Sequence, residues 1–141
     1  MTALSVGRGT STPFEVIGAP YIDANKLALE INQLDLAGLV VTPIHYTPTA
    51  SVFAQTLCHG LRFNMTDRKT FRPIALGLNL ARILHRDYPE EFDASKVNRL
   101  LINSKSIEQI RQGNAHSELE ATWAPGLQQF LTRRAPHLIY L

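Results

Sequence analysis

The feature that most constrains the fold is a long amphipathic segment that begins at Pro73. Proline suits the first turn of a helix because the N–H that it lacks would have no intrahelical partner there. Apolar residues then recur at helical spacing, and others widen the stripe: Leu76, Leu80, Ile83 and Leu84, with Ile74, Leu78 and Ala81 beside them. A stripe this wide predicts a helix that packs against a sheet.

Further helices are expected on both sides of this segment. Asp23 stands where an N-cap belongs, ahead of a helix at 24–34. Shorter helical pieces are expected at 95–101 and 106–112, and a final helix at 117–133. Pro125 should kink this last helix because it removes one backbone donor. Its apolar residues are expected to face inward: Leu119, Trp123, Leu127, Phe130 and Leu131.

Strands are expected at 14–17, where Gly18 would end the run, and from 39 onward. Pro43 and Pro48 confine this second strand to a sheet edge or end it early. A third strand is expected at 61–66, where apolar and polar side chains alternate, and a closing strand at 138–140. The uneven alternation of strands and helices predicts an α+β fold, a small mixed sheet packed against several helices in a single domain.

The composition is that of an ordinary folded domain and argues against several classes of protein. The 141 residues are 45% hydrophobic and 18% charged, which is enough apolar material for a core. The net charge of +2 is dispersed, so we expect no nucleic-acid binding. No apolar stretch approaches the ~20 residues of a membrane span. The N-terminal residues lack the pattern of a signal peptide, and they predict no location.

A glycine-rich loop, Val6-Gly7-Arg8-Gly9-Thr10, is the first candidate site. Glycines on both sides of Arg8 permit unusual backbone angles and the close approach of a ligand. The guanidinium is a planar fork suited to a carboxylate, and a turn at Pro13 would return Glu15 to the same cleft. The alternative is a surface loop with an Arg–Glu salt bridge, which contributes little to stability.

A second candidate, Thr66-Asp67-Arg68, lies at the end of an expected strand, where functional residues often project into a crevice. The alternative is that Asp67 caps a turn and Arg68 is solvated. Tyr21 and Tyr46 are candidate platforms for a sugar ring, with core packing as the alternative for each. Trp123 is expected in the core.

The third candidate, Cys58-His59-Gly60, places a thiol beside an imidazole. Adjacent residues rarely aim at one point, and no second Cys or His lies at ligand spacing. The other histidines are scattered along the chain: His45, His85, His116 and His137. We therefore expect no metal site, and the single cysteine can form no intrachain disulfide.

Taken as a literal string, the chain resembles a known bacterial family. The resemblance starts with Ser5-Val6-Gly7-Arg8-Gly9-Thr10, Pro13-Phe14-Glu15 and Gly18-Ala19-Pro20. It continues through Tyr46-Thr47-Pro48, Leu57-Cys58-His59-Gly60, Thr66-Asp67-Arg68 with Phe71 and Pro73, Tyr88-Pro89 and Leu138-Ile139-Tyr140. These motifs follow one another over essentially all 141 residues. The family was long of unknown function and is now associated with peptidoglycan exo-β-N-acetylmuramidases.

The resemblance implies a two-domain glycosidase that releases terminal N-acetylmuramic acid from peptidoglycan fragments. A Rossmann-like N-terminal domain and a smaller C-terminal domain would enclose the active site, and residues 1–141 correspond to the C-terminal domain. The family's usual acidic-Gly-Thr-Asn lead-in is replaced here by Met1-Thr2-Ala3-Leu4. Glycoside hydrolysis normally needs two carboxyl groups, so we expect the isolated chain to be inactive. The full-length family is expected to be periplasmic or secreted.

Carried over residue by residue, the resemblance gives Glu15 and Asp67 as candidate catalytic groups. The candidate substrate-binding residues are Arg8, Gly9, Thr10, Tyr21 and His59. Arg8 would recognise the lactyl carboxylate that distinguishes N-acetylmuramic acid from N-acetylglucosamine. No cofactor is expected.

The expected partners are a muropeptide or amino sugar and a Rossmann-like domain, in cis or in trans. A homodimer of the chain is also expected, because the surface facing the other domain would be apolar. Two alternative functions remain at this point. One is a non-catalytic peptidoglycan-binding module, and the other is a subunit that completes the enzyme with a separately encoded partner.

Overall fold

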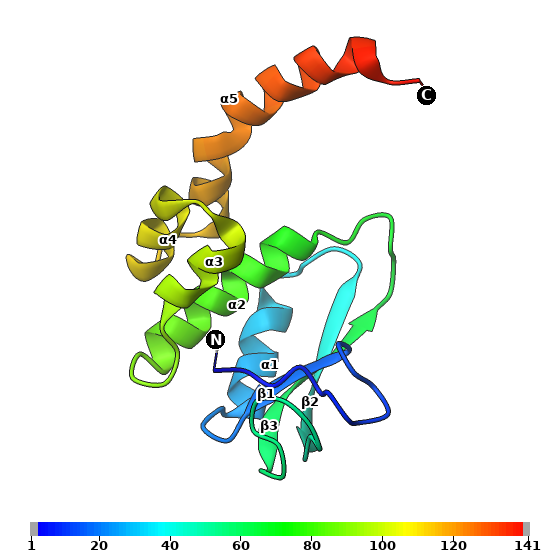
Figure 1. The fold of residues 1–141 in the computed structure, drawn as a ribbon, viewed down its shortest axis with the longest axis vertical. Helices are drawn as coiled ribbons and strands as arrows, with labels where there is room; N and C mark the ends of the chain where they lie inside the picture. The colour runs from blue at the N-terminus through cyan, green and yellow to red at the C-terminus, as the bar shows by residue number, and fades with distance from the viewer. Residues whose placement is uncertain (1–2, 140–141) are drawn as a thin grey trace.

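A computed structural model describes residues 3–139, in which a three-stranded sheet lies beside a group of helices (Figure 1). The elements are, in chain order, β1 (Val16–Ala19), α1 (Ala24–Gln33), β2 (Leu39–Tyr46), β3 (Cys58–Met65), α2 (Pro73–Asp87), η1 (Ala94–Val97), α3 (Asn98–Leu101), α4 (Ser104–Arg111), α5 (His116–Arg134) and η2 (Ala135–His137). The predicted α+β class is confirmed.

The strand order in the sheet is β1-β3-β2, and both hydrogen-bonded pairings are antiparallel. The sequence predicted a mixed sheet. β1 and β2 do run parallel to each other, joined through α1, but β3 lies between them. β1 starts and ends two residues later than predicted, because Gly18 continues the strand and pairs with Gly60 on one side and Ser5 on the other.

Helix α1 covers one face of the sheet, and Asp23 caps it as predicted, accepting a hydrogen bond from the Lys26 N–H at 3.0 Å. β2 is an edge strand, in agreement with the prediction from its prolines. The Asn32 amide group satisfies part of the free edge of β2. It donates to the Val41 carbonyl and accepts from the Val41 N–H, both at 2.9 Å.

Helix α2 forms where the apolar stripe predicted it, but it is α1 that covers most of the sheet. α2 packs on α1 along one side and on η1 and α4 along another. Its buried residues therefore extend around much of the helix, including Leu78, Leu80, Ile83 and Leu84. Leu76, near the N-terminal end of α2, joins sheet residues in the wall of a cleft.

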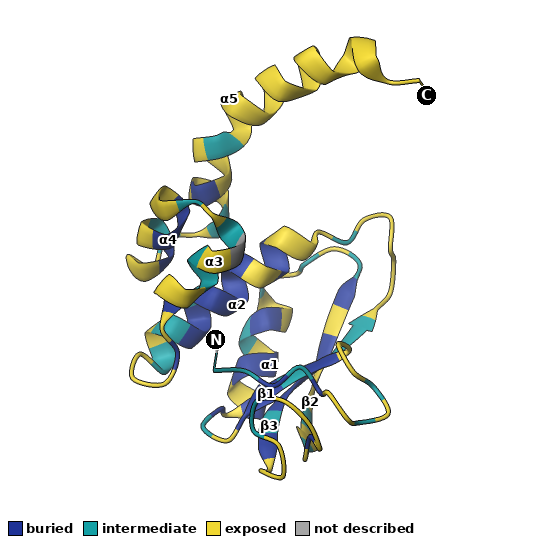
Figure 2. Ribbon diagram, in the orientation of Figure 1, coloured by how far each residue is buried: buried dark blue, intermediate teal, exposed yellow. Residues whose placement is uncertain are grey.

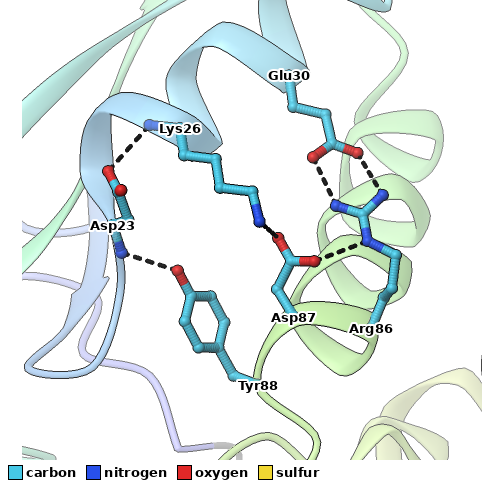
Figure 3. A network of polar contacts seen from close by, with 6 residues as sticks. All are labelled: Asp23, Lys26, Glu30, Arg86, Asp87 and Tyr88. Atoms are coloured by element: carbon cyan, nitrogen blue, oxygen red, sulfur yellow. Dashed lines mark hydrogen bonds and ion pairs between the residues drawn. The ribbon is translucent and has the colours of Figure 1, made fainter.

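A network of polar side chains ties α1 to the C-terminal end of α2 (Figure 3). Arg86 donates to both Glu30 carboxylate oxygens, at 2.8 and 2.7 Å, and to Asp87 at 2.7 Å. Asp87 also forms an ion pair with Lys26, in which Nζ of Lys26 lies 2.9 Å from Oδ2 of Asp87. These contacts fix the angle between the two helices and hold one end of the domain together.

Helix α5 runs away from the rest of the domain and is exposed over most of its length (Figures 1 and 2). It continues through Pro125 and buries only Leu119, with Trp123 half-buried. The prediction that Leu127, Phe130 and Leu131 face inward is wrong. Leu127 borders a surface hollow together with Ile74 and Leu101, but it is 50% exposed, as is Phe130.

The predicted closing strand and the length of the helices remain to be compared with the structure. Leu138 and Ile139 follow η2 outside any strand, in contrast to the predicted closing strand, and Tyr140 lies outside the described residues. Among the helices of residues 3–139, none is both long and apolar enough to cross a membrane.

Candidate functional site

An open cleft of about 460 Å³ lies where the sheet meets the N-terminal end of α2. Its walls are mainly apolar and contain two oppositely charged side chains, Glu15 and Arg68. The lining residues are Phe14, Glu15, Leu39, Phe63, Met65, Arg68, Phe71 and Leu76. The volume is in the range of small-molecule sites, which combine apolar walls with a few polar groups that orient the ligand.

Glu15 reaches the cleft because it immediately precedes β1. Its carbonyl accepts from the Phe63 N–H at 2.9 Å and its own N–H donates to Thr12 at 3.3 Å, so its backbone is held on both sides. Phe14 has a φ of 67°, a conformation that bulky residues rarely adopt. It is nevertheless 65% exposed. Backbone strain of this kind is common at functional sites. Phe53 and Ile102, which do not line the cleft, also have a positive φ.

The second predicted motif, Thr66-Asp67-Arg68, supplies Arg68 to the cleft rather than Asp67. The Asp67 carboxylate accepts from the Lys69 N–H at 2.8 Å, and this bond lowers the pKa of Asp67. Asp67 thus caps a turn, as the alternative interpretation of this motif held, while Arg68 lines the cleft with Glu15.

Gly38 allows this turn to close. Its carbonyl accepts from the N–H groups of Thr66 and Asp67, at 2.9 and 3.3 Å. Its φ is +76°, and a Cβ atom at this position would collide with the Asp67 carbonyl oxygen. A glycine is therefore required for the loop that carries Arg68 to pack against the start of β2.

Arg8 lies just outside the cleft, with its guanidinium carbon 5.4 Å from the centre of the Phe14 ring. This is the geometry of a cation–π contact. Since Phe14 lines the cleft together with Glu15, both Arg8 and Glu15 are close to this one aromatic residue. They are not on opposite sides of the domain, an arrangement that would have separated the two halves of the predicted motif.

Gly9 and Thr10 shape the loop that carries Arg8. The Thr10 hydroxyl donates to the Gly7 carbonyl at 2.7 Å. Gly9, with a φ of +78°, packs against Thr49, which donates to its carbonyl at 3.0 Å. Thr10 therefore closes the loop on itself, and Gly9 holds it against the segment that follows β2.

Tyr21 and His59 lie at the opposite end of the sheet from Glu15. The Tyr21 hydroxyl donates to the Ala3 carbonyl at 2.6 Å, and its ring packs on Tyr88. Burial, with a smaller effect of Glu91, raises the pKa of Tyr21 to about 12. His59 lies opposite His45 on the neighbouring strand. The structure does not bring either residue to the cleft.

Glu15 alone among the cleft residues was a candidate catalytic or binding residue in the sequence. The aromatic and charged residues that were missed are Phe14, Phe63, Phe71 and Arg68. Phe71 and Arg68 belong to motifs that were noted, but no local pattern says which residue of a turn points into a cleft. Phe63 belongs to an alternating strand, where an aromatic residue predicts core packing. No group of three or more potential metal ligands occurs within residues 3–139.

Chemically, the cleft offers aromatic walls, one carboxylate and one guanidinium, with a second guanidinium, that of Arg8, against the Phe14 ring. Such a set suits an amphipathic, oxygen-rich ligand with an anionic group. A glycosidase active site normally has two carboxyl groups. In the described part of the chain, Glu15 alone supplies one to the walls of this cleft.

The structure therefore defines a small α+β domain with an open cleft that contains one carboxylate and one guanidinium. The sequence matches the family model described as "Exo-beta-N-acetylmuramidase NamZ, C-terminal" over residues 1–140, and the chain belongs to this family. It is 36% identical over 142 residues to the peptidoglycan beta-N-acetylmuramidase NamZ of Bacillus subtilis strain 168. That alignment covers 99% of this chain and 34% of the relative, so the chain spans about a third of the relative's length.

Two crystal structures of DUF1343 family proteins from Bacteroides fragilis NCTC 9343 share the fold. One is 18% identical with a TM-score of 0.69, and the match covers 99% of this chain and 38% of that protein. The other is 23% identical with a TM-score of 0.68, covering 99% and 37%. These matches include α5, and in both proteins most of the chain lies outside the matched part.

Proposed function

We propose that this chain forms one wall of the sugar-binding cleft of an exo-acting β-N-acetylmuramidase, which releases terminal N-acetylmuramic acid from peptidoglycan fragments. The observation that carries the proposal is the cleft in which Glu15 and Arg68 lie among the aromatic rings of Phe14, Phe63 and Phe71. Membership of the NamZ C-terminal family and the named activity of the Bacillus subtilis relative support it.

Each part of the cleft has a role in this proposal. The C–H faces of a pyranose ring pack on the aromatic walls, and Glu15 approaches the glycosidic bond as general acid, base or nucleophile. The lactyl carboxylate of N-acetylmuramic acid pairs with a guanidinium, that of Arg8 or of Arg68. N-acetylglucosamine lacks this carboxylate and binds more weakly.

The second catalytic carboxyl group, in this proposal, lies on a Rossmann-like N-terminal domain joined in cis or supplied in trans. Two observations support this division. The chain spans 34% of the Bacillus subtilis relative. Asp67, the other candidate in the sequence, is held in a turn by the Lys69 N–H. The chain alone would therefore bind an amino sugar without hydrolysing it.

A non-catalytic module that binds muramic acid is the second candidate function. The observation that favours it is the single carboxylate among the cleft residues in the described chain. An activity assay distinguishes the enzyme from the binding module. In this assay the chain is mixed with the N-terminal part of the Bacillus subtilis relative. Hydrolysis of a chromogenic muramic acid glycoside by the mixture supports the enzyme, whereas turnover by this chain alone contradicts the division of carboxyl groups.

Sugar binding tests the cleft directly. Saturation-transfer NMR on the purified chain should show stronger binding of N-acetylmuramic acid than of N-acetylglucosamine. Arg8→Ala and Arg68→Ala, singly and together, should reduce this preference, because one charge-assisted hydrogen bond contributes about 1.5–3 kcal/mol. Arg133→Ala, at an exposed arginine of α5, is the matched control. An unchanged preference in the double variant would refute the proposed recognition of the lactyl group.

A further inference from the structure

The two histidines at the end of the β2–β3 pair form a cluster that the sugar cleft does not use. His45 and His59 are directly opposite each other in the register of the two strands, so both side chains project from the same face. Their Nδ1 atoms are 2.6 Å apart, and the rings meet edge to face with centroids 4.7 Å apart.

Among residues 3–139, the only side-chain hydrogen bond of either ring is the one between them, and neither ring takes part in an ion pair. His45 is exposed and His59 half-buried, so the pair is open to solvent. In the neutral pair one Nδ1 carries the shared proton and the other supplies a lone pair.

From this geometry we infer that His45 and His59 form a bidentate site for a borderline divalent transition-metal ion, such as Cu²⁺, Ni²⁺ or Zn²⁺. Neutral imidazole nitrogens are preferred ligands of these ions. Metal–nitrogen bonds of about 2.0–2.1 Å at an angle between 90° and 110° require the two nitrogens to lie roughly 2.9–3.4 Å apart. The observed separation of 2.6 Å is shorter than this range, so both side chains must rotate to move the two nitrogens apart and to turn their lone pairs toward one ion.

Binding needs no net loss of a proton from the neutral pair. The proton between the rings moves to Nε2 of the donating imidazole through solvent, and both Nδ1 lone pairs then bind the ion. Water fills the other coordination positions. Cys58 is not a third ligand, because its side chain points to the opposite face of the strand and is buried. Burial also raises the pKa of its thiol.

A metal at this position would link β2 to β3 beside the loop that joins them. This loop contacts the glycine-rich loop that carries Arg8, since the Ala50 N–H donates to the Arg8 carbonyl at 3.3 Å. Ligand binding to the folded state alone stabilises it by mass action, so the ion should raise the unfolding temperature. The inference is independent of the proposed sugar site.

Metal titration of the chain, purified without a histidine tag, tests the site. Calorimetry with Zn²⁺ and Ni²⁺ should show one ion per chain, and His45→Ala or His59→Ala should weaken binding by about 10²-fold, because the second imidazole binds intramolecularly. His137→Ala, at an exposed histidine outside the pair, is the control and should bind like the parent chain.

Electron paramagnetic resonance with Cu²⁺ gives a second readout. The parent chain should show coupling to two imidazole nitrogens and each single variant coupling to one. Circular dichroism in EDTA confirms that the variants are folded. Equal affinity in the parent chain and both single variants, or no binding by the folded parent chain, would show that the pair is only a hydrogen bond between strands.

Discussion

At the scale of single residues, the structure needs a glycine at one position of this domain and does not need it at another. Gly38 has a positive φ, and a side chain there would meet the Asp67 carbonyl. Gly77 lies exposed within α2, where an added Cβ would contact nothing within 4 Å. Glycine within a helix costs conformational entropy without any compensating function of the backbone.

We therefore expect Gly38→Ala to lower the free energy of unfolding by about 1–3 kcal/mol. Gly77→Ala should raise it by about 0.5–1 kcal/mol. Urea denaturation followed by circular dichroism measures both. The Gly38 variant should also weaken sugar binding, since the turn that carries Arg68 closes on Gly38. A neutral effect of Gly38→Ala would mean that the turn can pack elsewhere.

Residue-level reasoning from sequence found the right segments and often the wrong atom. The Thr66-Asp67-Arg68 motif was singled out, but whether Asp67 or Arg68 enters the cleft depends on the hydrogen bond between Asp67 and the Lys69 N–H. The contact between His45 and His59 depends on strand register, because 14 positions of chain separate them. Neither is visible in a local pattern of residue types.

At the scale of elements, periodicity predicted α1 and α2, because each buries apolar residues against neighbours present in this chain, and the prolines of β2 predicted its edge position. The same reasoning failed for α5. Its apolar residues have helical spacing, and the helix forms, but Leu127 and Phe130 are each 50% exposed. A sequence pattern shows that a face is apolar; the partner of that face need not be part of the same domain.

The link between α1 and α2 should make stability depend on pH. Arg86 and Lys26 lower the pKa of Asp87 to about 2. Because the folded-state pKa lies below the unfolded value of about 3.9, this stabilisation is complete above pH ~4 and is lost as the pH falls through 2. Its partners are partly exposed, so we expect about 1–2 kcal/mol rather than the full value of the shift.

Urea denaturation at pH 5 and at pH 2 measures this contribution. Asp87→Asn should lose about 1–2 kcal/mol less than the parent chain over this interval, since its side chain no longer titrates. Glu90→Gln, at an exposed position just beyond α2, is the matched control and should follow the parent chain. Parallel losses in the parent and Asp87→Asn chains would contradict the assigned role of the ion pairs.

At the scale of the whole molecule, the proposed Rossmann-like domain would account for both the exposed face of α5 and the single carboxylate among the cleft residues. The Bacillus subtilis relative and both Bacteroides fragilis proteins of similar fold extend well beyond the matched region. Large exposed side chains follow one another along the last part of the domain: Leu127, Phe130, Leu131, Leu138 and Ile139. Exposed apolar side chains that gather into a patch promote association, and Leu127, Phe130 and Leu131 have the i, i+3, i+4 spacing of one helix face.

The isolated chain should therefore self-associate through α5. Light scattering coupled to size exclusion should show a mass that rises with concentration above the monomer, and Leu127→Glu with Phe130→Glu should return the chain to a monomer. Val40→Glu, at an exposed apolar residue of β2, is the control. Adding the N-terminal part of the Bacillus subtilis relative should compete with self-association if both cover the same face. A monomer at every concentration would mean that α5 is stable without a partner on its apolar face. The exposed helix would then give no support to the proposed Rossmann-like domain.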